Sequence, residues 1–139
     1  MTAPLLDLHQ LGFAWPGQAE LLDIPSFKLE RNQSLFLKGP SGSGKTTLLG
    51  LIGGVHKAQR GTVRLLGSDL AALSAGARDR FRVDHTGYIF QQFNLLPYLS
   101  VLDNVTLPCR FSALRRERAL RQQPTLDTAA EHLLRELGL

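Results

Sequence analysis

A glycine-rich octapeptide between two apolar segments constrains this sequence more than any other feature. Residues 39–46 read Gly-Pro-Ser-Gly-Ser-Gly-Lys-Thr, which satisfies every fixed position of the pattern G-x-x-x-x-G-K-[ST]. The apolar residues 35–37 precede this run, and the helix-like segment 47–52 follows it. A strand, a glycine loop and a helix in this order are what a phosphate-binding loop requires. A chance glycine-rich turn is the alternative, and the flanking segments argue against it.

The residue types of the loop suit an anion that carries several negative charges. Glycine tolerates positive φ, so Gly39, Gly42 and Gly44 allow successive N–H groups to point inward at the positive end of the helix dipole. We expect Lys45 to reach the β- and γ-phosphates as a catalytic residue, and the Thr46 hydroxyl to hold Mg²⁺. The loop residues expected to bind the nucleotide are Gly39, Pro40, Ser41, Gly42, Ser43, Gly44, Lys45, Thr46 and Thr47.

Length and composition fit one globular domain. The 139 residues are 43% hydrophobic and 20% charged, which is ordinary usage for a soluble protein and argues against disorder or a fibrous repeat. No apolar run approaches the roughly 20 residues of a membrane span, and the start of the chain lacks the basic and apolar regions of a leader peptide. The single Cys109 cannot form an internal disulfide. These features predict a cytoplasmic location.

The net charge of +4 comes from one segment. Between residues 110 and 121 there are five arginines and one glutamate, and the rest of the chain holds eleven basic and eleven acidic residues. No aromatic residue interleaves with these arginines after Phe111, as a surface for single-stranded nucleic acid would require. We therefore expect a solvated helix face or a tether, with contact to a polyanion or a membrane surface as the alternative, and no nucleic-acid partner.

Apolar periodicity, turn residues and caps predict a mixed α/β fold. Strands are expected at 5–9, around 27–29, at 34–38, at 61–67 and at 86–90. Helices are expected over 47–52, from Ser74 toward Val83, from Ser100 to before Pro108, and from Leu126 to Leu137. The pattern predicts a core of parallel strands with helices, together with antiparallel strands from the first third of the chain.

A second motif narrows the class of protein. Residues 87–105 read Gly-Tyr-Ile-Phe-Gln-Gln-Phe-Asn-Leu-Leu-Pro-Tyr-Leu-Ser-Val-Leu-Asp-Asn-Val, so that an expected strand ends at Gln91 and passes into a loop. This run resembles the Q-loop of ATP-binding cassette (ABC) ATPases, the nucleotide-binding subunits of ABC transporters. The amino-acid sequence of residues 90–97 is most similar to that of cassettes of the lipoprotein-release, macrolide-export and peptide-export group. The alternative, two ordinary exposed glutamines, is weakened by the phosphate loop upstream.

The resemblance extends over about residues 5–139 and implies a set of roles. Gln91 would coordinate Mg²⁺ or the attacking water through its amide oxygen as a second catalytic residue. Trp15 occupies the place of the family's adenine-stacking aromatic, although Trp15 or Phe13 could simply belong to the core. The ligands implied are ATP and Mg²⁺. The partners implied are a transmembrane subunit, contacted through residues 92–110 at the inner face of the membrane, and a second cassette in a dimer.

Three further elements of such a cassette have no counterpart in the sequence: the Leu-Ser-Gly-Gly-Gln signature, a strand ending in adjacent Asp and Glu, and a switch histidine. No two carboxylates are adjacent anywhere in the chain, so the glutamate that serves as general base is absent. We expect residues 1–139 to be the N-terminal part of one ABC ATPase domain. Its antiparallel subdomain and phosphate-loop core would span about 1–93, and its Q-loop and the start of a helical subdomain about 91–139.

Two functional alternatives stay open from the sequence. The leading hypothesis is a subunit whose full-length parent couples ATP binding and hydrolysis to transport, while this chain alone binds nucleotide weakly and is inactive. One alternative is another P-loop enzyme, such as a kinase or a small GTPase. The other is a non-catalytic truncated product.

Overall fold

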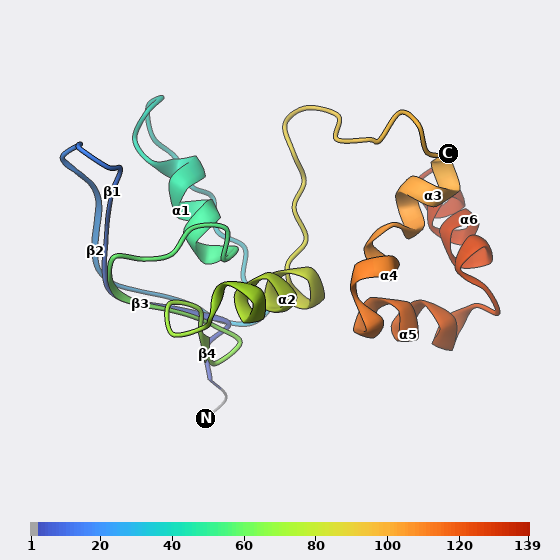
Figure 1. Ribbon diagram of the computed structural model, residues 1–139, viewed down its shortest axis with the longest axis horizontal. Coiled ribbons are helices and arrows are strands. Elements are labelled where there is room, and N and C mark those ends of the chain that lie inside the picture. The colour runs from blue at the N-terminus through green and yellow to red at the C-terminus, as the bar shows by residue number, and fades with distance from the viewer. Residues whose placement is uncertain (1–2) are drawn as a thin grey trace. The chain divides into compact units, whose positions relative to one another are not determined.

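The computed structural model describes residues 3–139. They form two compact units, residues 3–82 and 83–139 (Figure 1). The first unit is built on a four-stranded antiparallel sheet in the order β2-β1-β3-β4. Its elements are β1 Leu6–Ala14, β2 Glu20–Leu29, α1 Lys45–Ile52, β3 Arg60–Leu65 and β4 Ser68–Asp69. Helix α2, Ala75–His85, runs from the first unit into the second.

The core of the first unit lies between one face of the sheet and helix α1. Leu8 and Leu11 of β1, Val63 of β3 and Leu51 of α1 are each no more than 2% exposed and belong to one cluster. Leu48 joins them from the same face of α1. Burial of these side chains fixes the helix, and with it the loop that precedes the helix, against the sheet.

A bulge in β1 changes which side chains face this core. Leu6 and Leu8 are buried, and strict alternation would then bury residue 10, yet Leu11 is the next buried side chain. Gln10 has φ +47°, and the pairing of β1 with β3 shifts register there. A Cβ atom on Gly61 would lie 2.2 Å from the Gln10 carbonyl oxygen, so only glycine fits opposite the bulge.

Four short helices form the second unit: α3 Val101–Thr106, α4 Pro108–Phe111, α5 Ala113–Gln122 and α6 Leu126–Glu136. Local caps define their starts. Ser100 accepts a hydrogen bond from the Asp103 N–H at the start of α3, and Thr125 and Thr128 form a capping box at α6. The side chain of Asn104 bonds both backbone groups of Leu96 and so holds the preceding loop against α3.

Most of the predicted elements are confirmed, with two corrections. The mixed α/β class, the antiparallel N-terminal strands, the helix after the glycine loop and the helices that start after Ser74, Ser100 and Thr125 are present. The expected parallel strands at 34–38 and 86–90 are not: both segments lack regular secondary structure within residues 3–139. The backbone groups of a strand need a neighbouring strand as hydrogen-bond partner, and the sheet pairs neither segment. Parallel strands are also buried between layers, whereas Phe36 and Ile89 are 87% and 100% exposed.

Four of the five arginines in segment 110–121 lie on α5, and Arg110 lies on α4. Arg115 is not simply solvated. The Arg115 guanidinium donates to the carbonyl oxygens of Val83 at 2.6 Å and Thr86 at 2.9 Å. Ser112, which caps α5 and is 1% exposed, donates to Asp84 Oδ1. The start of α5 is thereby attached to residues 83–86, which belong to the same unit.

Candidate nucleotide-binding site

The glycine loop ends directly in helix α1, as the sequence predicts. Gly44 is the N-cap with φ +91°, and Gly42 has φ +79°, so both use the left-handed conformation that favours glycine. Gly39, which was also expected to tolerate positive φ, does not adopt it. At Gly39 the constraint is space, because an added Cβ would lie 2.7 Å from Ser43 Oγ.

Helix α1 begins without a side-chain cap. Gly44 offers no oxygen to the first amides, and the first turn contains no acidic residue. The N-terminal amides and the helix dipole together give this end a partial positive charge. Such an end is suited to a phosphate group.

Lys45 keeps its ammonium group at the loop. Nζ donates to the carbonyl oxygens of Gly39 at 2.7 Å and Pro40 at 2.6 Å, and lies 3.4 Å from Ser43 Oγ. The lysine is half-buried at the first position of α1. Its cationic group is therefore held beside the loop, where a phosphate oxygen could compete with the carbonyl oxygens through a stronger charge-assisted bond.

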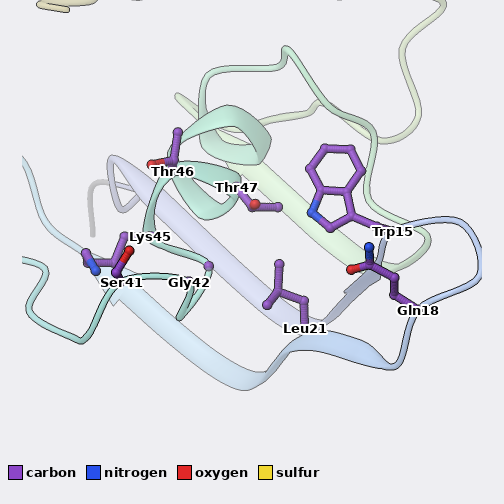
Figure 2. A pocket seen from close by; sticks show the side chains of 9 residues that line it. Trp15, Gln18, Leu21, Ser41, Gly42, Lys45, Thr46 and Thr47 are labelled. Carbon is purple, nitrogen blue, oxygen red and sulfur yellow. The ribbon is translucent and has the colours of Figure 1, made fainter. Parts of the chain in front are cut away.

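A cavity of about 440 Å³ connects the loop with the tryptophan of the β1–β2 turn. In Figure 2, Trp15 and Lys45 lie at opposite ends of this cavity, with Thr47 and Leu21 between them. The volume is in the range of small-molecule sites. The cavity is lined by Trp15, Gln18, Leu21, Ser41, Gly42, Gly44, Lys45, Thr46 and Thr47.

Trp15 is a surface aromatic at this cavity, whereas Phe13 is part of the core. Phe13 is 6% exposed and Trp15 is 37% exposed. The two rings meet edge to face, with centroids 5.1 Å apart and planes at 90°. The open part of the indole is thus available to a ligand, and the alternative that Trp15 is a core residue is not what the structure shows.

Salt bridges brace the turn that carries Trp15. Arg60 Nη2 lies 2.8 Å from Glu20 Oε1 and 3.0 Å from Asp23 Oδ1, both on β2. The hydrogen bond to Glu20, followed by that to Asp23, raises the pKa of Arg60 above its usual value. Arg60 crosses β1 at Gly12, where a Cβ atom would lie 2.7 Å from its Nε.

Six of the nine predicted loop residues line the cavity with Trp15, whereas Gly39, Pro40 and Ser43 do not, and Gln91 belongs to the second unit. Gln91 is exposed in the segment after Thr86, and its role toward Mg²⁺ stays a prediction. Sequence reasoning missed Gln18 and Leu21 as cavity residues. It also missed two neighbours of the tryptophan turn, His56 and Gln59. No motif marks them, since their contacts depend on how the chain returns to β1.

The sheet, the glycine loop and helix α1 define a mixed α/β protein of the phosphate-loop class. Comparison with known proteins gives the family. The family model described as "ABC transporter" matches residues 22–139. The chain therefore belongs to the ABC transporter family, and this membership decides against the kinase and GTPase alternative.

Individual relatives agree with this assignment. The chain is 37% identical over 139 residues to the macrolide export ATP-binding/permease protein MacB of Shigella flexneri, and 36% identical to MacB of Escherichia coli K12. Each match covers 98% of this chain and 20% of the relative. The chain thus spans about a fifth of the length of these curated relatives.

Solved structures give the same fold. A dimeric, post-hydrolysis state of the ATP-binding cassette MJ0796 bound to ADP and Pi superposes with a TM-score of 0.68 at 28% identity. That match covers 84% of this chain and 56% of the cassette. A second dimeric structure of MJ0796, described as a bacterial ABC transporter cassette, has a TM-score of 0.61 at 31% identity.

Within residues 3–139, no helix combines the length and the hydropathy needed to cross a bilayer. The same residues bring together no group of three or more His, Cys, Asp or Glu side chains that could hold a metal ion. Candidate oxygen ligands at the cavity are the hydroxyl groups of Ser41 and Thr46.

Proposed function

We propose that this chain forms the Mg-ATP site of a transport ATPase, with the triphosphate on the glycine loop and the adenine on Trp15. The observation that carries the proposal is the single cavity that Trp15 and Lys45 line from opposite ends. An indole face can stack on a purine, and a loop of amides with a lysine can replace the hydration of a polyphosphate. ADP and Pi in the MJ0796 cassette support the choice of nucleotide.

The residues at the loop also fit a magnesium ion. Mg²⁺ prefers hard oxygen ligands, retains several waters and is bound largely by substrate phosphates, and a Ser or Thr hydroxyl after the phosphate-loop lysine is one of its usual protein ligands. The Thr46 hydroxyl, which lines the cavity, is the residue we assign to this role. When bound, the ion would neutralise phosphate charge; Gln91 is our candidate for a second oxygen ligand.

We further propose that the protein acts at the inner face of a membrane with a transmembrane subunit and as a dimer of cassettes. The names of the relatives support this, since MacB is an ATP-binding/permease protein and the MJ0796 structures are dimeric. The segment 92–110 that we assign to the membrane subunit exposes large apolar side chains: Phe93, Leu95, Tyr98 and Val101 are 65–100% exposed. Clustered exposed apolar groups are typical of a contact surface.

Calorimetric titration of Mg-ATP into Lys45→Ala tests the site. Loss of the charge-assisted bonds is expected to weaken binding by about 1.5 to 3 kcal/mol, or roughly tenfold to a hundredfold. Lys38→Ala is the matched control. It removes the same charge from an exposed lysine that does not line the cavity, so its affinity should stay within about twofold of wild type. Equal affinities of wild type and Lys45→Ala would refute the proposed site.

A further inference from the structure

The side chain of Gln59 pairs with the backbone of the residue before Trp15. The Ala14 N–H donates to Gln59 Oε1 at 2.9 Å, and Gln59 Nε2 donates to the Ala14 carbonyl oxygen at 2.8 Å. The ladder between β1 and β3 ends at the pair Gly12 and Arg60, so Ala14 lies beyond it. The amide of Gln59 therefore takes the place of a paired strand residue and fixes the backbone that leads into Trp15.

The ring of Trp15 is held from a second side by His56. Their ring centroids are 5.2 Å apart with planes at 82°, an edge-to-face contact like the one that Phe13 makes from the core. The rings of Phe13 and His56 thus both contact the indole of Trp15 nearly at right angles. Trp15 is 37% exposed, and this exposed part of its surface is directed away from Phe13 and His56.

His56 is itself fixed to helix α1. The backbone N–H of His56 donates to the Gly50 carbonyl oxygen at 3.1 Å, and a Cβ atom on Gly50 would lie 2.5 Å from His56 Cδ2. The imidazole therefore packs against the helix where only a glycine leaves room. The phosphate loop is at the N-terminal end of this helix, and the segment with His56 and Gln59 follows its C-terminal end.

We propose that Gln59 and His56 are positioning residues that fix Trp15 at a set distance from the phosphate loop. The stacking surface for the base of a nucleoside triphosphate is then in place before the nucleotide binds. The inference rests on the proposed function. Its physical basis is preorganisation: a ring that is ordered before binding loses less freedom when a base stacks on it. Because both ends of the cavity are attached to α1, the helix acts as the spacer between them.

The chain provides its own probe for this proposal, since Trp15 is the only tryptophan. Gln59→Met removes both bonds to Ala14 while nearly keeping side-chain length. Full release of an indole that is 37% exposed would raise its exposure nearly threefold. We expect the acrylamide quenching constant of Trp15 to rise about 1.5- to 2-fold, with a shorter rotational correlation time of the indole.

Gln33→Met is the matched control. It removes another exposed glutamine amide bond to backbone, from the Glu30 N–H to Gln33 Oε1 at 2.9 Å, in a turn that does not line the cavity. Quenching of Trp15 should be unchanged in this variant. His56→Ala is a second variant. It removes the ring contacts with Trp15, Phe13 and helix α1 but keeps both bonds of Gln59 to Ala14, and it should raise quenching as Gln59→Met does.

Titration of two ligands separates this inference from the proposed function. ATP has a base and inorganic tripolyphosphate does not, so Gln59→Met should weaken ATP about three- to tenfold and leave tripolyphosphate within about twofold. Unchanged quenching and ATP affinity in Gln59→Met and His56→Ala would overturn the positioning role, while the loss of both ligands in Lys45→Ala would still support the site. Equal weakening of both ligands by Gln59→Met would also overturn it. Binding of neither ligand by wild type would overturn the site and the inference together.

Discussion

Replacement of Gly44 by alanine is expected to destabilise the first unit more than the same replacement at Gly42. Both glycines have left-handed backbone, with φ +91° and +79°. That conformation costs an alanine roughly 1 to 2 kcal/mol, and the smaller entropy of the unfolded chain offsets about 0.4 to 1 kcal/mol. The backbone alone therefore predicts a net loss of about 0 to 1.5 kcal/mol at either position.

The two sites differ in the space around the new methyl group. At Gly42 no heavy atom lies within 4 Å of an added Cβ, whereas at Gly44 Leu22 Cδ2 would be 2.8 Å away and Leu21 Cγ 3.2 Å away. Leu22 is 8% exposed and belongs to the core cluster, so it cannot move without disturbing other side chains. Overpacking of this kind costs typically 1 to 3 kcal/mol. We expect Gly44→Ala to be less stable than Gly42→Ala by about that amount.

Urea unfolding followed by Trp15 fluorescence measures this difference, because the only tryptophan lies in the first unit. Gly67→Ala is the control outside the loop. Gly67 has φ +82° and an open surrounding, so this variant should match Gly42→Ala. If Gly44→Ala and Gly42→Ala unfold with free energies within about 0.5 kcal/mol of each other, the close packing of Gly44 against Leu22 is not a constraint on the loop.

Two further predictions concern the second unit and the chemistry. Ser112→Ala removes the cap of α5 and the bond to the Asp84 carboxylate, and should lower the free energy of unfolding by about 1 to 3 kcal/mol. Faster amide hydrogen exchange in α5 is the measurement, and unchanged protection would contradict it. The wild-type chain should release phosphate from Mg-ATP no faster than Lys45→Ala, because no adjacent carboxylates supply a general base. A colorimetric assay that finds turnover clearly above that of the variant would show this reasoning to be wrong.

Local sequence patterns were sufficient to predict the phosphate loop and most helix boundaries. The glycine loop predicted the helix that follows it, although α1 starts at Lys45 and not at residue 47, and Ser100 caps α3 as the sequence indicated. In each case the interacting groups lie within a few residues of one another, so residue type and spacing determine the geometry. The family resemblance stated from residues 87–105 agrees with the family found by comparison.

Strand formation was less predictable because it depends on partners. Residues 34–38 and 86–90 have strand-like patterns, yet neither segment is paired in the sheet. An apolar run indicates that a segment can be a strand, but the hydrogen bonds must come from neighbouring backbone. The bulge at Gln10 is similar, since it depends on the approach of Gly61 from another strand.

The sequence by itself determined a loop suited to phosphate, the helix after it and the family to which the chain belongs. Only the tertiary structure decided that Trp15 and Lys45 share one cavity, and that Gln59 holds Ala14 from 45 positions away along the chain. The physical reason is range. Backbone preferences and caps act over a few residues, whereas the meeting of distant side chains is set by the packing of β1 and α1 around a common core.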